Sequence, residues 1–452
     1  MEKIITICSL FTIFFFNGVG QTIQFTEHKL YQASSRIFFV TAADLDKDGD
    51  QDILYTQPDQ DTLQWFENQG GGNFIHRNIG IFAQAFSVWM VDFDSDGDND
   101  LLASSYDPSK VILFENDGNL NFILHLLSTE VPHPLTIAAK DIDGDGDYDI
   151  SCATQDAGKG MMLLRNDGNL TFTPMDLSTQ PYTSTWTEIT DLDHDGDLDI
   201  LGNHFQANGG ILWYEQTAPL VFTEHLIPYP WTHGFTAADI DGDGDDDLAA
   251  VTCGSQIAWF QNDGNMNFTN IPIGSGFSCA VAITAADLNL DQETDLVATA
   301  WSASKVAWWE NDGNENFSMQ SVSDSLIKPN GVAVADLNND SLPDIVSGGY
   351  SGGLFWWENQ GDGVGITGKK NEDFATVTFN QTTRKLNIKL RPGIISVVIE
   401  MMDIHGKMLI IQDSPSSSSS IHCNGLRSGL YLVRIKSNDQ TMIKKIMINP
   451  LR

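Results

Sequence analysis

The chain has 452 residues, of which 41% are hydrophobic; this excludes a disordered protein and leaves room for several domains. Its net charge of −37 is uneven. Residues 366–452 contain 13 Lys and Arg and 6 Asp and Glu. The rest of the chain contains 11 Lys and Arg and 55 Asp and Glu, which gives it a net charge of −44. A body this acidic repels phosphate, so a nucleic-acid partner is excluded.

The first 20 residues have the pattern of a secretory signal peptide. Lys3 gives a short basic region, residues 4–16 an apolar core, and residues 17–20 small side chains for cleavage before Gln21. The 13-residue core is too short to anchor the chain in a bilayer, and no later segment is long enough to cross one. The mature protein is therefore expected outside the cell or on its outer surface.

An acidic stretch of nine residues then recurs through the chain. The first copy runs from Asp44 to Asp52, with acidic side chains at alternate positions and Gly49 at position six. Seven copies begin at intervals of 48, 49, 50, 48, 48 and 49 residues. A period near 50 residues is typical of a propeller, a solenoid or an array.

The composition of this stretch predicts a cation site. The carboxylates at positions one, three, five and nine, with the position-seven carbonyl, offer only oxygen, and Ca²⁺ tolerates such irregular sets of six to eight oxygens. The glycine permits the turn with positive φ that brings them together. The candidate ligands are Asp44, Asp46, Asp48, Asp50 and Asp52; Asp92, Asp94, Asp96, Asp98 and Asp100; Asp141, Asp143, Asp145, Asp147 and Asp149; Asp191, Asp193, Asp195, Asp197 and Asp199; Asp239, Asp241, Asp243, Asp245 and Asp247; Asp287, Asn289, Asp291, Glu293 and Asp295; and Asp336, Asn338, Asp340, Leu342 and Asp344.

The last two copies depart from this pattern, because Asn289 and Asn338 replace an aspartate, and Gln292 and Ser341 replace the glycine. We expect weaker binding there. An EF-hand is excluded for the full copies, since no glutamate stands at position twelve.

The repeats share an order of four short strand patterns: a small-residue strand before the acidic stretch, an apolar strand after it, an aromatic strand, and a strand after a turn that is Asn-Asp-Gly in several copies. Seven such units predict an all-β, seven-bladed propeller over residues 21–360. Tryptophans of the third strands, such as Trp308 and Trp356, are expected to pack between blades. The seventh unit lacks a fourth strand, and residues 24–30 are expected to supply it and close the ring.

A ligand site is expected on the face opposite the acidic stretches, where the second strands end. Several aromatic side chains and histidines fall at or near that face, and such side chains suit the C–H faces and hydroxyls of sugar rings. The alternative is that they only pack the loops. The candidates are Tyr106, Trp186, His204, Phe205, Trp231, His233, Trp301 and Tyr350.

Residues 361–371 have the composition of a linker, and residues 372–452 contain strand patterns without repeats, which predicts a small β-sandwich. Four cysteines follow the signal. They do not form a dense disulfide framework, and whether Cys253 and Cys279 are bonded stays open.

The acidic motif Asp-x-Asp-x-Asp-Gly-x-x-Asp, followed by Ile or Leu, resembles the calcium loop of FG-GAP/VCBS repeat proteins, which include integrin-type propellers and seven-bladed fungal lectins. The resemblance covers roughly residues 22–359, and five copies match in full. It implies calcium as the cofactor.

Residues 425–433 and 444–448 resemble the C-terminal sorting domain of the Bacteroidetes type IX secretion system. This implies export across the outer membrane, with the secretion machinery as a partner of residues 372–452. An ordinary adhesive sandwich is the alternative.

No motif identifies a reaction. Residues 349–353 fit the nucleophile-elbow pattern, but they join two predicted strands and not a strand and a helix, so we interpret them as a turn. A calcium-stabilised surface module that binds glycans or proteins is favoured. The alternative is a polysaccharide-degrading lyase or hydrolase, but the repeats contain no insertion long enough for a catalytic subdomain.

Overall fold

The computed structural model describes residues 23–33 and 35–361, and in the C-terminal part residues 375–380, 384–391, 397–403, 408–414, 418–423, 426, 429–436 and 441–448. The predicted signal peptide and almost all of the predicted linker lie outside the described residues. The chain divides into two compact units, Met1–Asp362 and Gly363–Arg452. The described residues of both contain strands and no helix, which confirms the predicted all-β class.

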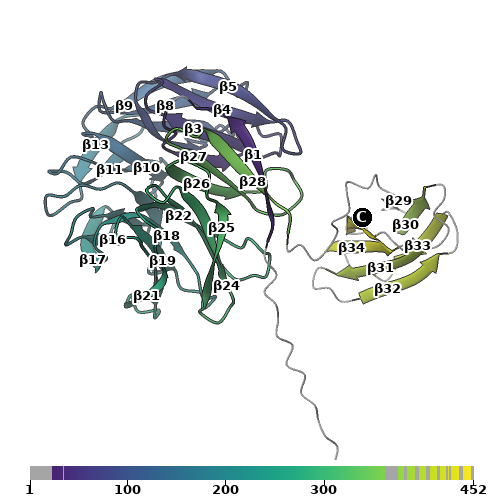
Figure 1. The fold of residues 1–452 in the computed structure, drawn as a ribbon. Coiled ribbons are helices and arrows are strands. Elements are labelled where there is room, and N and C mark those ends of the chain that lie inside the picture. The colour runs from purple at the N-terminus through teal and green to yellow at the C-terminus, as the bar shows by residue number, and fades with distance from the viewer. Residues whose placement is uncertain are drawn as a thin grey trace, which may run out of the picture. The chain divides into compact units, whose positions relative to one another are not determined.

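The described residues of the first unit form seven antiparallel four-stranded sheets, the blades of a propeller (Figure 1). From the inside outward the sheets are β2(Val40–Ala43), β3(Asp52–Gln57), β4(Thr62–Asn68), β5(Phe74–Ile81); β6(Ala85–Val91), β7(Asp100–Ser105), β8(Lys110–Asn116), β9(Phe122–Ser128); β10(Pro134–Lys140), β11(Asp149–Thr154), β12(Met161–Asn166), β13(Phe172–Asp176); β14(Thr187–Thr190), β15(Asp199–Asn203), β16(Gly210–Ala218), β17(Val221–Pro228); β18(Thr232–Ala238), β19(Asp247–Thr252), β20(Gln256–Asn262), β21(Phe268–Ser275); β22(Ala280–Ala286), β23(Asp295–Ala300), β24(Lys305–Asn311), β25(Phe317–Ser323); and β26(Pro329–Ala335), β27(Asp344–Gly349), β28(Leu354–Asn359), β1(Phe25–Tyr31).

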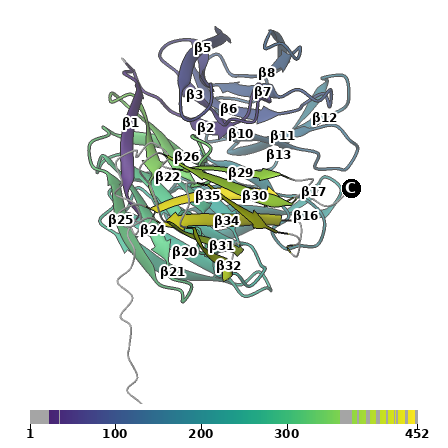
Figure 2. The same ribbon diagram turned by 90° about the vertical axis from the view of Figure 1, so that its right-hand side faces the viewer.

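The innermost strands pack around one axis. β2 contacts β6 and β26, and β22 contacts β18 and β26. Figure 2 shows β2, β6, β10, β22 and β26 grouped in the middle of this unit. Small residues such as Ala42 and Ala285 suit these strands, because the backbones crowd near the axis.

The N-terminal strand completes the last sheet, which is the pairing that the sequence predicts. β1 pairs antiparallel with β28, from Phe25 opposite Asn359 to Tyr31 opposite Leu354. In Figure 1 the purple β1 lies beside the green β28. The outer edge of this sheet is therefore supplied by residues more than 300 positions away in the chain.

The core of this unit lies between neighbouring blades. Every residue of β7 and of β23 is buried, since both faces of these second strands are covered. Trp356 is 4% exposed and packs in one cluster with Phe66 of the first blade. Trp309 is fully buried in a cluster with Trp259 of the blade before it. These contacts confirm that the third-strand tryptophans pack between blades.

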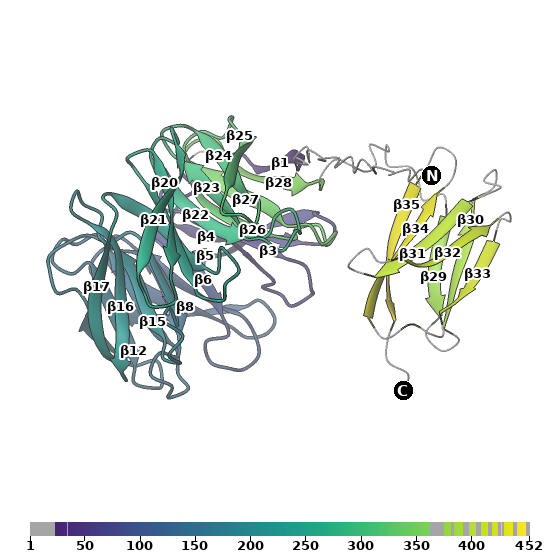
Figure 3. The same cartoon turned by 90° about the horizontal axis from the view of Figure 1, so that it is seen from below.

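The second unit consists of two sheets with a shared core (Figure 3). Leu386 and Ile388 of one sheet pack in a single cluster with Ile399 and Val433 of the other. The strands of these two sheets are β29(Ala375–Asn380), β30(Lys385–Leu390), β33(Ser418–His422), and β32(Met408–Ser414), β31(Val397–Asp403), β34(Gly429–Lys436), β35(Thr441–Ile448).

Candidate functional site

The aspartate loops, defined here as the seven nine-residue acidic stretches, join the first and second strands of each blade. The ninth residue of a loop is also the first residue of the second strand, as Asp199 is in β15. It is buried, and its two oxygens accept main-chain hydrogen bonds from Leu192 (3.2 Å) and Gln216 (2.8 Å). The same two bonds occur in the first loop, where Asp52 accepts from Leu45 and Asn68, each at 2.8 Å. Position nine therefore fastens the loop to the third strand of its own blade.

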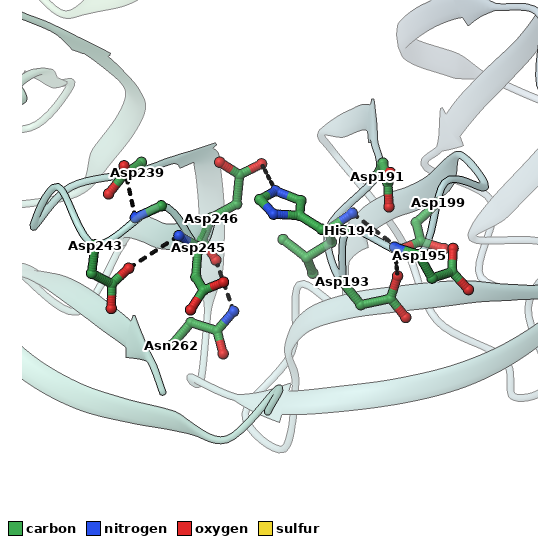
Figure 4. A network of polar contacts seen from close by, with 12 residues as sticks. Asp191, Asp193, His194, Asp195, Asp199, Asp239, Asp243, Asp245, Asp246 and Asn262 are labelled. Atoms are coloured by element: carbon green, nitrogen blue, oxygen red, sulfur yellow. Dashed lines mark hydrogen bonds and ion pairs between the residues drawn. The ribbon is translucent and has the colours of Figure 1, made fainter. Parts of the chain in front are cut away.

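The earlier residues of the loop curl around its centre. Gly196 has φ of 100°, and its N–H donates to Asp191 Oδ2 at 3.0 Å. The N–H of Asp195 donates to Asp193 Oδ1 at 3.2 Å, and the N–H of Asp197 donates to Asp195 Oδ1 at 2.9 Å. Figure 4 shows that this arrangement turns the carboxylates of Asp191, Asp193 and Asp195 toward one region.

The loops that match the motif in full bring carboxylate oxygens within 4.8 Å of one another. Positions one, three and five meet in the first, second, fourth and fifth loops, whereas positions one, three and nine meet in the third. Three first-position oxygens, Oδ1 of Asp44, Asp92 and Asp191, are buried without a hydrogen-bond partner among the described residues. A buried, unpartnered carboxylate oxygen is costly unless a cation completes its coordination. The donor set therefore fits a hard cation such as Ca²⁺, and that calcium binds there stays a prediction.

Position seven differs from the other candidate positions. The side chains of Asp50, Asp147 and Asp245 lie beside turn glycines that follow the third strands, at Gly70, Gly168 and Gly264. These carboxylates do not belong to the clusters of the loops, which is consistent with a main-chain carbonyl ligand at position seven, the role predicted for Asp50. Leu342 of the seventh loop occupies the same position, with its side chain near Gly361.

The sixth and seventh loops adopt the same turn although other residues replace the glycine and one aspartate. Gln292 and Ser341 adopt φ of 78° and 72° in place of glycine. A left-handed conformation is strained for a residue with a side chain. Asn289 and Asn338 each donate to the position-five carboxylate of their loop, at 2.9 and 3.2 Å. Weaker cation binding in the sixth and seventh loops stays a prediction.

Burial and mutual repulsion disfavour the charged form of several loop carboxylates. Desolvation, followed by the nearby carboxylates, raises the pKa of Asp46 and of Asp94. Desolvation also raises the pKa of Asp52 to about 7 and that of Asp199 to about 6, against the main-chain hydrogen bonds that lower it. A bound cation would remove this penalty, because it favours the ionised form.

Neighbouring loops are tied together by residues that the sequence analysis did not single out. Position-eight side chains reach the preceding loop: Asn99 Nδ2 donates to the Asp44 carbonyl at 2.7 Å, and Thr294 Oγ1 donates to the Asp239 carbonyl at 2.9 Å. Between the fourth and fifth loops, Asp246 lies 3.8 Å from His194 Nε2 (Figure 4). These side chains hold the loops in register across blade boundaries.

In four blades, an amide side chain at or near the end of the third strand adds a second tie. Asn311 Nδ2 donates to the Ile240 carbonyl of the preceding loop at 2.9 Å, and Asn359 Nδ2 donates to the Leu288 carbonyl at 2.9 Å. The signal was present in the sequence, because Asn or Gln recurs at this position of each repeat and an amide is otherwise rare in a buried strand.

The axial cavity, a hollow of about 510 Å³, lies at the ends of the first and second strands that are remote from the aspartate loops. Three of the predicted ligand residues, Tyr106, His233 and Trp301, line it. The complete lining is Arg36, Phe38, Gln84, Phe86, Tyr106, Leu135, Gln155, Thr185, His233, Cys279, Val281, Trp301 and Asn330.

Trp186 lies deeper along the same axis. A hollow of about 20 Å³ shares Phe38 and His233 with the axial cavity, and it shares Phe39 and Trp186 with a third hollow of about 290 Å³. Glu188 also lines this third hollow and accepts hydrogen bonds from Trp186 Nε1 (3.2 Å) and the Ala237 N–H (3.1 Å). Burial raises the pKa of Glu188 to about 7.

The remaining candidates do not line the axial cavity. Phe205 packs edge-on against Trp231 and His233, with ring centroids 5.6 and 5.2 Å apart. His204 lies 4.7 Å from Tyr182. Tyr350 is 44% exposed and packs edge-on against Trp301 at 6.4 Å. For these residues the alternative of loop packing describes the geometry better.

Several lining residues, among them Arg36, Phe38 and Phe86, were not predicted from the sequence. Phe38 and Phe86 pack edge-to-face at 4.6 Å, and Phe86 lies 5.2 Å from Tyr106. The available signal was that Phe38 and Phe86 stand at or near the start of a first strand, close to the axis.

A disulfide joins Cys253 to Cys279, a pairing that the sequence left open. Cys279 also lines the cavity.

Comparison with known proteins identifies both units of the chain. The FG-GAP-like repeat family matches residues 44–103, 92–152, 141–202, 239–298 and 287–347, and the secretion system C-terminal sorting domain matches residues 380–449. No curated protein matches this sequence.

Two solved structures match this chain, the first of them with a similar fold. BBS1N, solved in complex with ARL6DN, has a TM-score of 0.54 at 11% identity, over 74% of this chain and 96% of that one. PorZ, a bacterial surface component of the type IX secretion system of Porphyromonas gingivalis, has a TM-score of 0.46 at 12% identity, over 91% of this chain and 59% of that one.

The repeat matches cover residues 44–202 and 239–347, which is more than half of the chain. The sorting domain marks the chain for export by type IX secretion to the cell surface or the medium. In the described residues, no helix has the length and apolar character needed to span a membrane. The chain belongs to the FG-GAP-like repeat family and ends in a type IX secretion sorting domain.

Proposed function

We propose that this protein is a calcium-stabilised binding module of the cell surface or medium that holds a glycan in its axial cavity. The observation that carries the proposal is the cavity itself, an aromatic and amide-lined hollow of about 510 Å³ at the end of the propeller remote from the aspartate loops. This volume falls within the range of small-molecule sites, about 300–1,000 Å³.

Calcium would stabilise the propeller and would not contact the bound glycan. The carboxylate clusters of the loops lie at the opposite ends of the first and second strands from the cavity. The buried, unpartnered oxygens of Asp44, Asp92 and Asp191 support a bound cation, and the ties between loops would spread its effect from blade to blade. Metal binding at such sites becomes folding free energy.

The lining of the axial cavity suits a sugar ring. Tyr106 and Trp301 offer aromatic faces for the ring's C–H groups. Gln84, Gln155 and Asn330 offer amides for its hydroxyls. His233 adds an imidazole that is neutral at pH 7, because burial lowers its pKa to about 4.

The test is a glycan array probed with the purified protein in millimolar calcium. We expect retention of a defined set of glycans, recovered uncleaved. Tyr106→Ala and Trp301→Ala should each weaken binding by about two- to tenfold, because stacking on an aromatic ring contributes about 0.5–1.5 kcal/mol. Tyr350→Ala is the matched control, since Tyr350 is exposed near Trp301 but does not line the cavity.

Three outcomes would contradict the proposal. The first is that no glycan is retained, the second is that only peptides or proteins are retained, and the third is that Tyr106→Ala and Trp301→Ala bind as the wild type does. Release of shortened or unsaturated products would instead favour a polysaccharide-degrading enzyme.

A further inference from the structure

Arg36 is the one side chain of fixed charge in the lining of the axial cavity. It precedes β2, and its guanidinium lies over the Phe86 ring, 5.1 Å from the centroid. Its side chain is 29% exposed. The aromatic face holds the guanidinium in place by a cation–π interaction while the fork of N–H groups stays available.

The partners of Arg36 leave this fork largely free. The nearest carboxylate is Asp59, whose Oδ2 lies 3.5 Å from Arg36 Nε, but Asp59 is 49% exposed and does not line the cavity. Nε is buried and makes no hydrogen bond among the described residues, so the two terminal NH₂ groups form the part of the fork that a ligand would meet. A half-exposed ion pair of this kind contributes little, about 0–1 kcal/mol. Arg36 can therefore bind a second anion without losing a strong partner.

The cavity also lacks carboxylates, which is unusual for this chain. None of the described residues that line it is Asp or Glu, although the chain outside residues 366–452 carries 55 of them. At the other end of the first and second strands, the aspartate loops gather carboxylates within 4.8 Å of one another. The lining of the axial cavity thus contains one arginine, several aromatic rings and no carboxylate, within a strongly negative unit.

Building on the proposed function, we propose that the axial cavity selects a sugar residue that carries a carboxylate, with Arg36 as the partner of that carboxylate and Tyr106 as the face on which the ring stacks. Tyr106 is placed for this role because its ring centroid lies 5.2 Å from that of Phe86, and the Arg36 guanidinium packs over the Phe86 ring. The guanidinium fork matches a planar carboxylate in two parallel N–H···O bonds.

The charge of the site favours a carboxylate over a phosphate. Arg36 is the one cation in the lining and balances a single negative charge; Lys328 lies over the Trp301 ring, 4.0 Å from its centroid, but does not line the cavity. A phosphate monoester carries about −1.5 to −2 at pH 7. The excess would remain inside a unit of net charge −44. A sulfate ester also carries one charge, but it is tetrahedral and matches the fork less well, so sulfated sugars belong in the test.

The experiment compares four groups of glycans on one array: hexuronate oligosaccharides, sialylated glycans, sulfated glycans, and the neutral parents of each. The purified protein is used in millimolar calcium. We expect retention of carboxylated members and loss of that retention when the same oligosaccharides are methyl-esterified, since the ester removes the charge and leaves the ring.

Variants then assign the effect to Arg36. Arg36→Gln should weaken binding of the best carboxylated oligosaccharide by about ten- to hundredfold, the range for loss of a charge-assisted hydrogen bond. Arg36→Lys should give an intermediate loss, because the charge stays and the fork is lost. Arg77→Gln is the matched control, since Arg77 pairs with Glu67 at the outer edge of the first blade, away from the cavity.

The outcomes separate this inference from the proposed function. Equal binding of esterified and free oligosaccharides, a preference for neutral or sulfated glycans, or unchanged binding by Arg36→Gln and Arg36→Lys would overturn it. If neutral glycans bind and Tyr106→Ala weakens that binding, the proposed function stands and the carboxylate inference fails. If no glycan binds, both fail. If Arg36→Gln does not fold, the esterification and Arg36→Lys results still decide.

Discussion

The aspartates of each loop divide into two kinds with different physical roles. The ninth residue, such as Asp199, is buried, and its two oxygens accept hydrogen bonds from main-chain N–H groups and from Trp213 Nε1 (2.9 Å). The third and fifth residues, such as Asp193 and Asp195, stay near the surface and converge on one another. In the fourth loop the first kind maintains the loop, and the second kind, with the first-position aspartate, is available for a cation; in the third loop the ninth residue, Asp149, also belongs to the carboxylate cluster.

This division predicts that substitutions of the two kinds of aspartate depend differently on calcium. Asp199→Asn should lower the free energy of unfolding by about 1.5–3 kcal/mol both with calcium and in metal-stripped protein, because it leaves buried N–H donors without acceptors. Asp195→Ala should lower the melting temperature only in calcium, since in stripped protein it removes one of several repelling carboxylates. Thermal unfolding in both conditions measures the difference.

Asp340→Ala is the matched control for Asp195→Ala, since Asp340 occupies the same position in the seventh loop, where Asn338 has replaced one carboxylate. Its effect in calcium should be smaller. Equal losses for Asp195→Ala with and without calcium would count against a cation in the fourth loop.

The ninth-position aspartates also predict an unusual pH dependence. Burial raises the pKa of Asp52 to about 7, that of Asp100 to about 6 and that of Asp247 to about 7, from an ordinary value of 3.8. Between pH 4 and 7 the folded state then binds more protons than the unfolded state, so stability falls as pH rises.

We expect the melting temperature of metal-stripped protein to decrease from pH 4.5 to pH 7. Saturating calcium should abolish or reverse this decrease, because the cation favours the ionised carboxylates. Melting curves across this range, with and without calcium, test the prediction. A melting temperature that rises with pH in stripped protein would contradict it.

The strands show which parts of the structure the sequence could predict. The 48- to 50-residue period, the Asn-Asp-Gly turns and the loop motif predict the all-β propeller, because these features depend on local chemistry repeated along the chain. The match between residues 24–30 and other fourth strands predicts the pairing of β1 with β28. Register across blades could not be predicted, since the ties of Asn99 and Asn311 join residues 55 and 71 positions apart.

The axial cavity was harder to predict for the same reason. Its wall takes one or a few residues from each of several repeats, and these residues do not share a type. Arg36 lies before the first strand of the first blade, where no repeat pattern marks it. Tyr106, His233 and Trp301 were found because they stand at strand ends, whereas Phe205 and Tyr350 satisfy the same criterion and pack outside the cavity.

The N-terminal strand should be essential for the last blade. Deletion of residues 21–30 removes most of β1 and leaves β28 with an open edge, where unpaired N–H and C=O groups promote association between chains. It also removes the hydrogen bond from Trp357 Nε1 to Glu27 (3.2 Å). We expect aggregation or loss of cooperative unfolding, measured by light scattering and thermal melts. A monomeric deletion variant with the wild-type melting temperature would refute this role.

The whole molecule combines an acidic propeller with a basic C-terminal unit. Residues 366–452 carry a net charge of +7, with 13 basic against 6 acidic side chains. The sorting domain accounts for the C-terminal unit. The acidity of the propeller is concentrated in the aspartate loops, and without a cation the clustered carboxylates of the five loops that match the motif in full repel one another. The central claim is that calcium in these loops makes the propeller stable enough to present its axial cavity outside the cell.

The most direct test is the thermal unfolding of metal-stripped protein during a calcium titration at neutral pH. We predict a low melting temperature in stripped protein and a large rise as calcium approaches about 0.1–1 mM, the range of extracellular calcium modules. Mg²⁺ at the same concentrations should have a smaller effect, because it requires a near-octahedral site. A melting curve that is the same in stripped protein and in millimolar calcium would contradict the account.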